Sequence, residues 1–320
     1  MSVKKQVVLV GAGNMGSHHA RVISQSDSAE LAVLVDPRED VGSAVAARFG
    51  ATWHPELPDL EPYDAVVVAA ATEAHHELAM QVLGSDRPLL IEKPVADSLL
   101  RTEEILALAE SRDLPMMCGL LERYNPAVIT ARAAMHAPLH ITATRHSPYA
   151  PRIRTGVAWD LLVHDVDLAI NLIGTQPTTV SSKLGFFHPE SAADAEDVAS
   201  TILGFEGGAV AQISASRVGQ HKVRTLAIHE LDRLIEVDLL RRNLTIYHHV
   251  SEDSVDDGPS YRQQTIIEIP EIPPSPEPLT AQFARFMEVI DGGADAAAER
   301  ATILPSHQVI DHVIQERKQT

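Results

Sequence analysis

Short apolar runs alternate with segments of helical periodicity over the first 120 residues. The runs have the length of strands, and the segments between them place apolar residues three and four positions apart. This alternation predicts a parallel sheet with helices on both faces, and the nearly continuous apolar runs fit strands that are buried on both sides. The predicted strands are 6–10, 31–35, 65–69, 88–91 and 115–118, and the predicted helices are 14–26, 38–50, 73–85 and 98–113.

After about residue 121 the strand-like segments begin to follow one another directly. Glycine pairs such as 207–208 fit hairpin turns between them. We therefore predict an α/β domain over residues 1–120 and an α+β domain with a large, mostly antiparallel sheet over residues 121–320. In the second domain the predicted helices are 125–135, 159–173, 279–291 and 305–317, and the predicted strands are 139–147, 179–187, 198–206, 209–217, 223–230, 233–240, 244–250 and 263–269.

Composition limits the class of protein. Hydrophobic residues make up 45% of the chain and charged residues 22%, which is ordinary for a soluble globular protein. The net charge of -18 argues against a nucleic-acid or anionic-membrane partner, and no apolar run has the length of a membrane span. The single cysteine, Cys118, and the lack of a signal-peptide pattern favour the cytoplasm. Acidic tracts at 190–197 and 251–258 are predicted to be solvated loops.

The motif "GAGNMG" at 11–16 follows the first predicted strand and opens the first predicted helix. Three glycines in this spacing are by themselves a weak signal, and a packing turn is the alternative. In a dinucleotide fold they permit the tight turn, the approach of backbone to the phosphates and close helix packing. Asp36, at the end of the second predicted strand, would accept hydrogen bonds from a ribose and repel a 2′-phosphate, which favours NAD. Arg38 leaves NADP open.

Lys93 ends the fourth predicted strand, between Glu92 and Pro94. The carboxyl edge of a parallel sheet is where ligands bind in this architecture, and a proline at this place is compatible with a cis bond. A solvated strand tip is the alternative interpretation of Lys93.

Asp160 and His164 are four residues apart, so on a helix they share a face. They form either an ion pair on the helix surface or a general base with its orienting carboxylate. A zinc site is a third option, but the chain lacks a second pair of ligands at suitable spacing, so no metal is expected.

These segments together resemble the glucose–fructose oxidoreductase / inositol dehydrogenase (Gfo/Idh/MocA) family. The resemblance covers the whole chain and rests on "GAGNMG", Asp36, "ATEAHHELA" at 71–79, "EKP" at 92–94 and "GVAWDLLVHDVDL" at 156–168. It implies a Rossmann domain followed by an open-faced antiparallel sheet, and an NAD cofactor with NADP possible. It also implies a dehydrogenase that oxidises a ring hydroxyl of an inositol, a hexose or a UDP-sugar (at C3) to a ketone.

The resemblance also implies roles for single residues. Lys93 would contact the nicotinamide and the reacting hydroxyl, while His164 removes the hydroxyl proton with Asp160 beside it. The cofactor-binding residues would be Gly11, Gly13, Asn14, Met15, Gly16, Asp36, Arg38, Thr72, His75, Glu92 and Lys93. The substrate-binding residues would be Arg123, Tyr124, Asn125, Arg152, Asp160 and His164.

Some of these assignments have structural alternatives. Asn125 also fits a helix cap, with Pro126 in the first turn. The cationic cluster of residues 145–154 would either bind a phosphorylated or nucleotide-linked sugar or form a solvated loop. Its basic members are Arg145, His146, Arg152 and Arg154.

Two other activities compete with the dehydrogenase: an NADPH-dependent reductase of a ketosugar or imine, and a non-catalytic sensor, which Lys93 and His164 disfavour. Apolar alternation in 209–217 and 233–240 predicts a sheet face that needs a partner, hence a homodimer or homotetramer built on this sheet.

Overall fold

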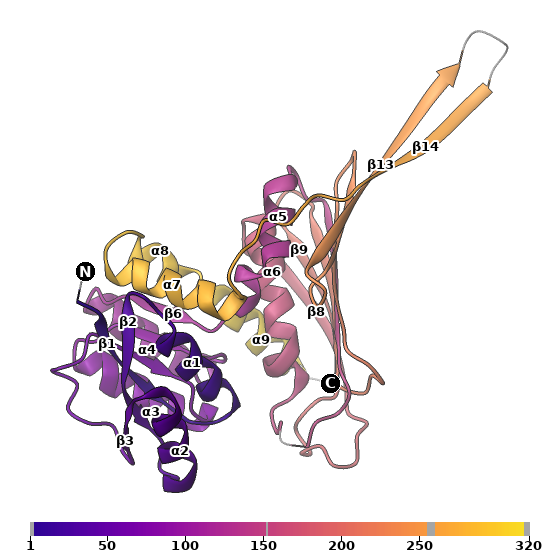
Figure 1. The fold of residues 1–320 in the computed structure, drawn as a ribbon. Helices are drawn as coiled ribbons and strands as arrows, with labels where there is room; N and C mark the ends of the chain where they lie inside the picture. Colours follow the sequence, from indigo (N-terminus) through magenta and orange to yellow (C-terminus); the bar gives the residue numbers. More distant parts are fainter. Residues whose placement is uncertain (1–2, 152, 255–259, 317–320) are drawn as a thin grey trace. The chain divides into compact units, whose positions relative to one another are not determined.

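The computed structural model describes residues 3–151, 153–254 and 260–316 (Figure 1). The chain forms two compact units. The first consists of Met1–Leu121 and Pro276–Gln308, and the second of Glu122–Ser275 and Val309–Thr320.

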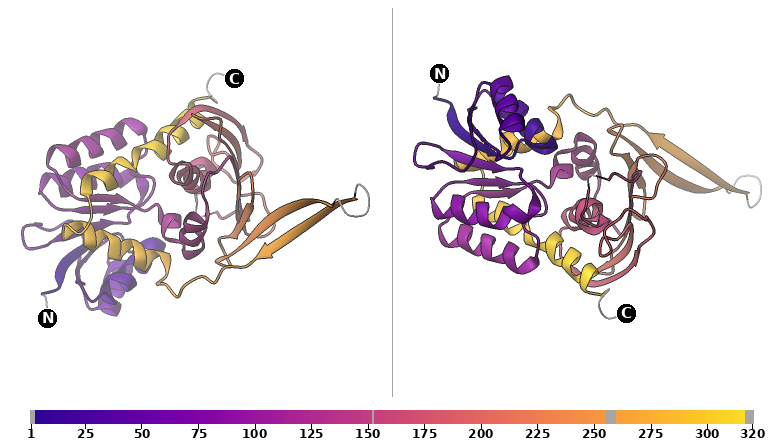
Figure 2. Two further views of the ribbon diagram at one scale, coloured as in Figure 1. Left: turned by 90° about the horizontal axis from the view of Figure 1, so that it is seen from above. Right: turned by 90° about the horizontal axis from the view of Figure 1, so that it is seen from below.

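The first unit is built on a parallel six-stranded sheet with the order β3-β2-β1-β4-β5-β6. Helices lie on both faces (Figure 2): α1 contacts α2 and α7, and α3 contacts α4. The strands are β1 (Lys5–Val10), β2 (Ala29–Val35), β3 (Thr52–His54), β4 (Ala65–Val68), β5 (Leu89–Ile91) and β6 (Met116–Cys118). The helices are α1 (Asn14–Ser24), α2 (Glu39–Phe49), α3 (Thr72–Gly84), α4 (Leu99–Ser111), α7 (Pro278–Ile290) and α8 (Ala296–Ala301), while α9 (Leu304–Glu316) is divided between the units after Gln308.

This sheet confirms the predicted α/β class, because its central strands are apolar and buried on both sides. All four residues of β4 are 0% exposed, and Cys118 is buried at the end of β6. The pattern did not reveal β3, whose sequence Thr-Trp-His contains no apolar run. β3 pairs in parallel with the end of β2 as an edge strand, and a pairing of three residues leaves no periodic signal in the sequence.

The segment Pro276–Gln308 differs from the predicted boundary, which placed everything after residue 120 in the second domain. Gln282 of α7 donates from Nε2 to the Cys118 carbonyl at 3.1 Å, and Arg300 of α8 donates from Nη1 to the Leu114 carbonyl at 2.6 Å. These bonds tie the segment to the β6 region of the first unit. Periodicity along the chain shows that a helix forms, but not which sheet it covers.

The second unit contains an eight-stranded sheet with the order β14-β13-β12-β11-β7-β10-β9-β8. Every neighbouring pair is antiparallel except β7 and β10, which confirms the predicted mostly antiparallel sheet. The strands are β7 (His140–His146), β8 (Pro177–Gly185), β9 (Val198–Phe205), β10 (Val210–Ser216), β11 (Val223–His229), β12 (Leu234–Asp238), β13 (Asn243–Ser254) and β14 (Ser260–Glu268). The helical segments are η1 (Leu121–Tyr124), α5 (Pro126–Ala134), η2 (Ala158–Leu162) and α6 (Val163–Ile173).

Side chains alternate across this sheet, but not as the oligomer prediction assumed. The apolar residues of β10 and β12, such as Ile213 and Ile235, are buried on the face that α5, η2 and α6 contact. The intervening positions, such as Gln212 and Glu236, are exposed. The alternation in 209–217 and 233–240 therefore fills the core of the unit, and the idea that it creates an apolar open face was wrong.

Among the described residues, no helix combines the length and the apolar character that crossing a membrane requires.

Candidate functional site

The glycines in the turn between β1 and α1 are needed for two different reasons. A Cβ on Gly11, whose φ is +103°, would lie 2.4 Å from the Ala69 carbonyl oxygen, and one on Gly16 would lie 1.9 Å from the Gly11 carbonyl oxygen. These two positions are glycine because the first unit packs closely there. A Cβ on Gly13 would meet no heavy atom within 4 Å. Packing does not explain Gly13, whereas a phosphate approaching the backbone does.

The first turn of α1 has the features of an anion site. Gly13 precedes the helix, and no side chain caps its N-terminal N–H groups within the part of the chain that the structure describes. Unsatisfied N–H groups and the helix dipole favour a negative charge at such an end. Asn14 is exposed and Met15 is partly buried in this turn. The residues present therefore fit a dinucleotide pyrophosphate.

Asp36 follows β2 and is 2% exposed. Its carboxylate accepts hydrogen bonds from the Ala12 N–H at 2.8 Å and from Arg38, whose Nε and Nη2 lie at 2.9 and 2.8 Å. Burial alone would raise the pKa of Asp36, but the hydrogen bonds from Arg38 and Ala12 outweigh burial and hold the pKa below its ordinary value. The carboxylate is thus charged and fixed beside the glycine turn.

Polar contacts hold the segment that follows β5. His19 Nε2 lies 2.8 Å from Glu92 Oε1, and the Lys93 N–H donates to Glu92 Oε2 at 3.3 Å. His75 of α3 lies with Nδ1 2.8 Å from the carbonyl oxygen of Pro94. The Lys93–Pro94 peptide bond is cis.

The structure thus shows contacts that fix the backbone around Lys93 from within the first unit. Glu92 and His75 supply them, which gives both predicted cofactor residues a structural task. Thr72, at the first position of α3, is partly buried. Sequence reasoning missed His19: "HH" at 18–19 gave no sign that the second histidine is buried against a strand end.

In the second unit, Asp160 lies in the π-helical segment η2, and His164 lies in the first turn of α6. Single π turns inside helices are frequent at functional sites. Both side chains are partly exposed, whereas the residues between them, Leu161, Leu162 and Val163, are buried.

The other two acids of this helix are enclosed. Asp165 accepts from Arg145 Nε and Nη2, both at 2.8 Å, and Asp167 accepts from Arg123 Nε at 2.7 Å. Asp165 and Asp167 are 1% and 2% exposed, so they form buried ion pairs rather than pairs on the helix surface. This arrangement leaves Asp160 and His164 as the ionisable pair on the partly exposed side of the helix.

Several predicted substrate residues have structural partners in the second unit. Arg123 pairs with Asp167, and Asn125 caps α5 by accepting from the Ala127 N–H at 3.1 Å. Asn125 is 2% exposed and also donates to the Leu239 carbonyl, so the structure supports the helix-cap interpretation.

The basic cluster before the helix is not a uniform cationic loop. Arg145 is 2% exposed, so the idea that it offers charge to a substrate was wrong: Asp165 and Glu122 already neutralise it. His146 Nε2 lies 3.0 Å from Ser214 Oγ. Arg154 and Tyr124 are exposed and partly buried, respectively, and Arg152 lies outside the described residues.

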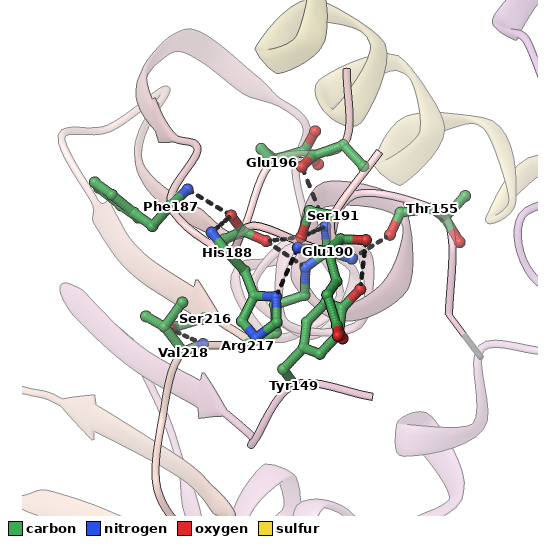
Figure 3. A network of polar contacts seen from close by, with 12 residues as sticks. Tyr149, Thr155, Phe187, His188, Glu190, Ser191, Glu196, Ser216, Arg217 and Val218 are labelled. Carbon is green, nitrogen blue, oxygen red and sulfur yellow. Dashed lines mark hydrogen bonds and ion pairs between the residues drawn. The ribbon is translucent and has the colours of Figure 1, made fainter. Parts of the chain in front are cut away.

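A polar network fixes the loop before η2 (Figure 3). Glu196 Oε1 accepts from the Ala158 N–H at 2.7 Å, and a Cβ on Gly156 would lie 2.2 Å from the same carboxyl group. Arg217 donates to Asp197 at 2.7 Å and to the Thr155 carbonyl at 2.8 Å. The network therefore sets where the helix that carries Asp160 begins.

The prediction that residues 190–197 form a solvated loop was wrong at its end, because Glu196 and Asp197 are 4% and 0% exposed. A run of acids looks the same in sequence whether its members face water or backbone N–H groups. Most of the second acidic tract, 251–258, lies outside the described residues or has undescribed side chains. No group of three or more His, Cys, Asp or Glu side chains in the described ranges is arranged to hold a metal ion.

The parallel sheet, the open glycine turn and the fixed acid after β2 define an NAD-binding oxidoreductase of the Rossmann type. The chain belongs to the GFO/IDH/MocA family. Residues 5–120 match the family described as "Oxidoreductase family, NAD-binding Rossmann fold", and residues 127–231 match the GFO/IDH/MocA C-terminal domain.

Two relatives illustrate the family. The chain is 30% identical over 243 residues to UDP-N-acetylglucosamine 3-dehydrogenase of Acidithiobacillus ferrooxidans, covering 75% of this chain and 76% of the relative. It is 26% identical over 223 residues to inositol 2-dehydrogenase of Rhizobium meliloti, covering 65% and 68%.

Solved structures show the same fold. UDP-N-acetylglucosamine 3-dehydrogenase from Acidithiobacillus ferrooxidans is 26% identical, has a TM-score of 0.81, and is matched over 98% of this chain and 100% of that one. Levoglucosan dehydrogenase in complex with NADH and levoglucosan is 18% identical, with a TM-score of 0.83 and coverage of 99% and 98%.

Proposed function

We propose that this dehydrogenase oxidises a ring hydroxyl of a sugar or cyclic polyol to a ketone. One observation carries the proposal: of the four ionisable side chains on the η2–α6 helix, arginines enclose two, and Asp160 and His164 stay partly exposed. A general base must be reachable by substrate, whereas a structural acid need not be. The named activities of the relatives, on UDP-N-acetylglucosamine and inositol, support a substrate of this chemical class.

The proposed roles follow from the chemistry of each group. His164 in its neutral form takes the hydroxyl proton, and Asp160 orients the imidazole and stabilises its protonated form. Lys93 donates a hydrogen bond to the reacting oxygen. Its backbone is fixed by Glu92 and by the contact between His75 and Pro94. NAD, when bound, would accept the hydride. Gly13, the first turn of α1 and Asp36 would hold its pyrophosphate and adenosine ribose.

A second candidate, an NADPH-dependent reductase, is favoured by Arg38. The Arg38 side chain is 58% exposed and forms an ion pair with Asp36. This is the position where the 2′-phosphate of NADP would need a cation. In this alternative the same Asp160–His164 pair would return a proton to the product alkoxide.

A substrate screen tests the proposal and separates the candidates. Purified protein is incubated with NAD or NADP and with inositols, hexoses, hexose phosphates or UDP-sugars, and the reverse reaction is run with ketosugars. We expect NAD-linked oxidation of at least one ring hydroxyl. Tight binding of cofactor without turnover of any compound would instead indicate a sensor.

We also propose a homodimer or homotetramer through the second-unit sheet. The support comes from β14, an edge strand on which Ile266 and Ile267 are 52% and 59% exposed. Its hairpin with β13 extends away from the rest of the sheet (Figure 1), and an isolated hairpin is marginally stable in water. Light scattering is expected to give a multiple of 34.7 kDa, and a monomer that persists at all concentrations contradicts the proposal.

A further inference from the structure

Two arginines lie side by side on neighbouring strands of the second-unit sheet. β11 pairs with β7 in an antiparallel register that places Arg224 opposite Arg145. Arg224 shares its face of β11 with Leu226 and Ile228, which are 1% and 0% exposed. Side chains alternate along a strand, so both arginines lie on the face that the helices cover.

The two arginines differ in how their N–H donors are used. Arg145 donates to Asp165 from two nitrogens and to Glu122 from the third, all at 2.8 Å. Within the described part of the chain, the Arg224 side chain makes one hydrogen bond, from Nη1 to Glu122 Oε1. Its length of 3.5 Å is at the limit for a hydrogen bond. Its side chain is 37% exposed. Arg145 thus neutralises the buried acids, and Arg224 keeps most of its planar fork available.

Arg224 is linked through Arg145 to the helix that carries the proposed base, because Arg145 pairs with Asp165, the residue after His164. Burial lowers the pKa of Arg224, and the charge of Arg145 acts in the same direction. The carboxylates that oppose this effect are Glu122, Asp165 and Asp160. A guanidinium stays protonated in such surroundings, so Arg224 keeps its positive charge.

We propose that Arg224 binds an oxyanion of the substrate, a carboxylate or phosphate group attached to the sugar, next to the hydroxyl that Asp160 and His164 address. This inference rests on the proposed function and narrows it from neutral polyols to acidic sugar derivatives. A planar guanidinium fork matches the two oxygens of a carboxylate or phosphate, and bonds between charged groups are the strong ones. An oxyanion would accept from those N–H groups of Arg224 for which the described residues provide no acceptor.

Kinetics on matched substrates tests the proposal. Arg224→Gln removes the charge, and Arg224→Lys keeps the charge but loses the fork. The control is Arg241→Gln, in the β12–β13 turn, where the side chain is 80% exposed. For a hexuronate, a hexose phosphate or a UDP-sugar, whichever the wild type oxidises, Arg224→Gln is expected to raise KM about 10–100-fold. Arg224→Lys should give a smaller rise, and Arg241→Gln none.

The three substrates distinguish the carboxylate from the phosphate, and a neutral hexose or inositol provides the baseline. If Arg224→Gln changes KM equally for neutral and acidic substrates, the oxyanion site is refuted while the proposed function stands. A fall in kcat with unchanged KM for the acidic compounds refutes it as well.

Calorimetry separates this proposal from the activity itself. Glucuronate, glucose 6-phosphate and UDP-N-acetylglucosamine are titrated into wild-type and variant proteins that are saturated with NADH. Binding that depends on Arg224 supports the site even if no sugar is turned over, a result that would refute the proposed dehydrogenase. Binding that is the same in wild type and Arg224→Gln refutes the site. Thermal unfolding of each variant confirms that it is folded.

Discussion

Both units bury an aspartate against an arginine, but the pairs Asp36–Arg38 and Asp197–Arg217 are built differently. In the first unit Asp36 is 2% exposed, while Arg38, two residues further on, is 58% exposed. In the second unit Asp197 and Arg217 are 20 residues apart, at the open ends of the paired strands β9 and β10, and are 0% and 6% exposed. Asp197 accepts in addition from the Phe187 N–H at 2.6 Å, so it is surrounded by donors of the protein itself.

The difference indicates what each aspartate does. A fully enclosed pair contributes to stability, because breaking it leaves a buried charge without a partner. A pair with an exposed arginine can open at little cost and give the carboxylate to a ligand. The same distinction applies within one helix, where Asp165 is enclosed and His164 is partly exposed. Enclosed groups should therefore determine the free energy of unfolding, whereas partly exposed groups should determine binding and turnover.

The largest effect on activity is expected from His164→Ala. If His164 is the general base, turnover should fall by about 10²–10⁴-fold, with NAD affinity nearly unchanged, because the first unit holds the cofactor. In the wild type the rate of oxidation should rise with pH as the imidazole loses its proton, and the variant should lose this dependence. Steady-state kinetics across pH and NAD titration measure both.

Asp165→Asn is the matched comparison one residue away. It weakens an enclosed pair with Arg145, so we expect its main effect in the denaturation midpoint rather than in the pH profile. Near-normal turnover of His164→Ala with an unchanged pH profile would show that the Asp160–His164 pair is structural, and Lys93 or Tyr124 would then be the next bases to test.

The sequence drew attention to partly exposed candidate residues more readily than to the enclosed ion pairs. The glycine turn and Asp36 stand in a local pattern of strand, turn and helix, which one stretch of chain specifies. Lys93 and His164 were singled out by motifs that need no knowledge of packing. The correctly predicted strands likewise follow from local apolar runs that are long enough to be buried.

The enclosed groups depend on pairings across long stretches of chain. Arg145 meets Glu122 and Asp165 only because the β7 register and the turn of α6 bring them together. Nothing within a few residues of Arg145 distinguishes it from an exposed arginine. The prediction for Asp197 failed for a similar reason: its immediate neighbours in the sequence are acidic and small, and its hydrogen-bond partners lie 6 to 20 residues away.

Asp197→Ala should give the largest loss of stability. It removes the acceptor of Arg217 and of two backbone N–H groups, and the free energy of unfolding should fall by about 3–5 kcal/mol. Chemical denaturation measures the change. Glu206→Ala, an exposed acid in the turn between β9 and β10, is the control and should change stability by about 0.5 kcal/mol or less. Equal effects of the two variants would contradict the enclosed-pair interpretation.

The same aspartate predicts a pH dependence of stability. Burial would raise the pKa of Asp197, but hydrogen bonds from Ser191, His188, Phe187 and Arg217 outweigh burial and lower it strongly. A carboxyl group with a lower pKa in the folded state stabilises the fold above its unfolded pKa and loses this effect as pH falls. Below about pH 5, wild-type stability should therefore decrease more steeply with falling pH than that of Asp197→Ala. Parallel slopes in denaturation series at several pH values would contradict this prediction.

The smallest effect is expected from the Asp36–Arg38 pair of the first unit, whose arginine is exposed. Asp36 repels a 2′-phosphate, so the wild type should prefer NAD over NADP. Asp36→Ala should lower the ratio of kcat/KM for NAD to that for NADP by about 10-fold or more, which narrows or reverses the preference. The ratio of kcat/KM values for NAD and NADP measures the change. A wild-type preference for NADP that Asp36→Ala leaves unaltered would contradict the assignment.

Arg38→Ala sharpens this test, because it acts in the opposite direction. The exposed guanidinium is the cation that a 2′-phosphate would meet, so its removal should increase the preference for NAD. The change should be only about 2–5-fold, because an ion pair with a partner that is mostly in water is weak and screened by salt. Raising the salt concentration should shrink the Arg38 effect more than the Asp36 effect, since Asp36 is buried and acts through a fixed position. If Arg38→Ala instead abolishes binding of both cofactors, Arg38 holds Asp36 in place and the pair is structural, like that of Asp197.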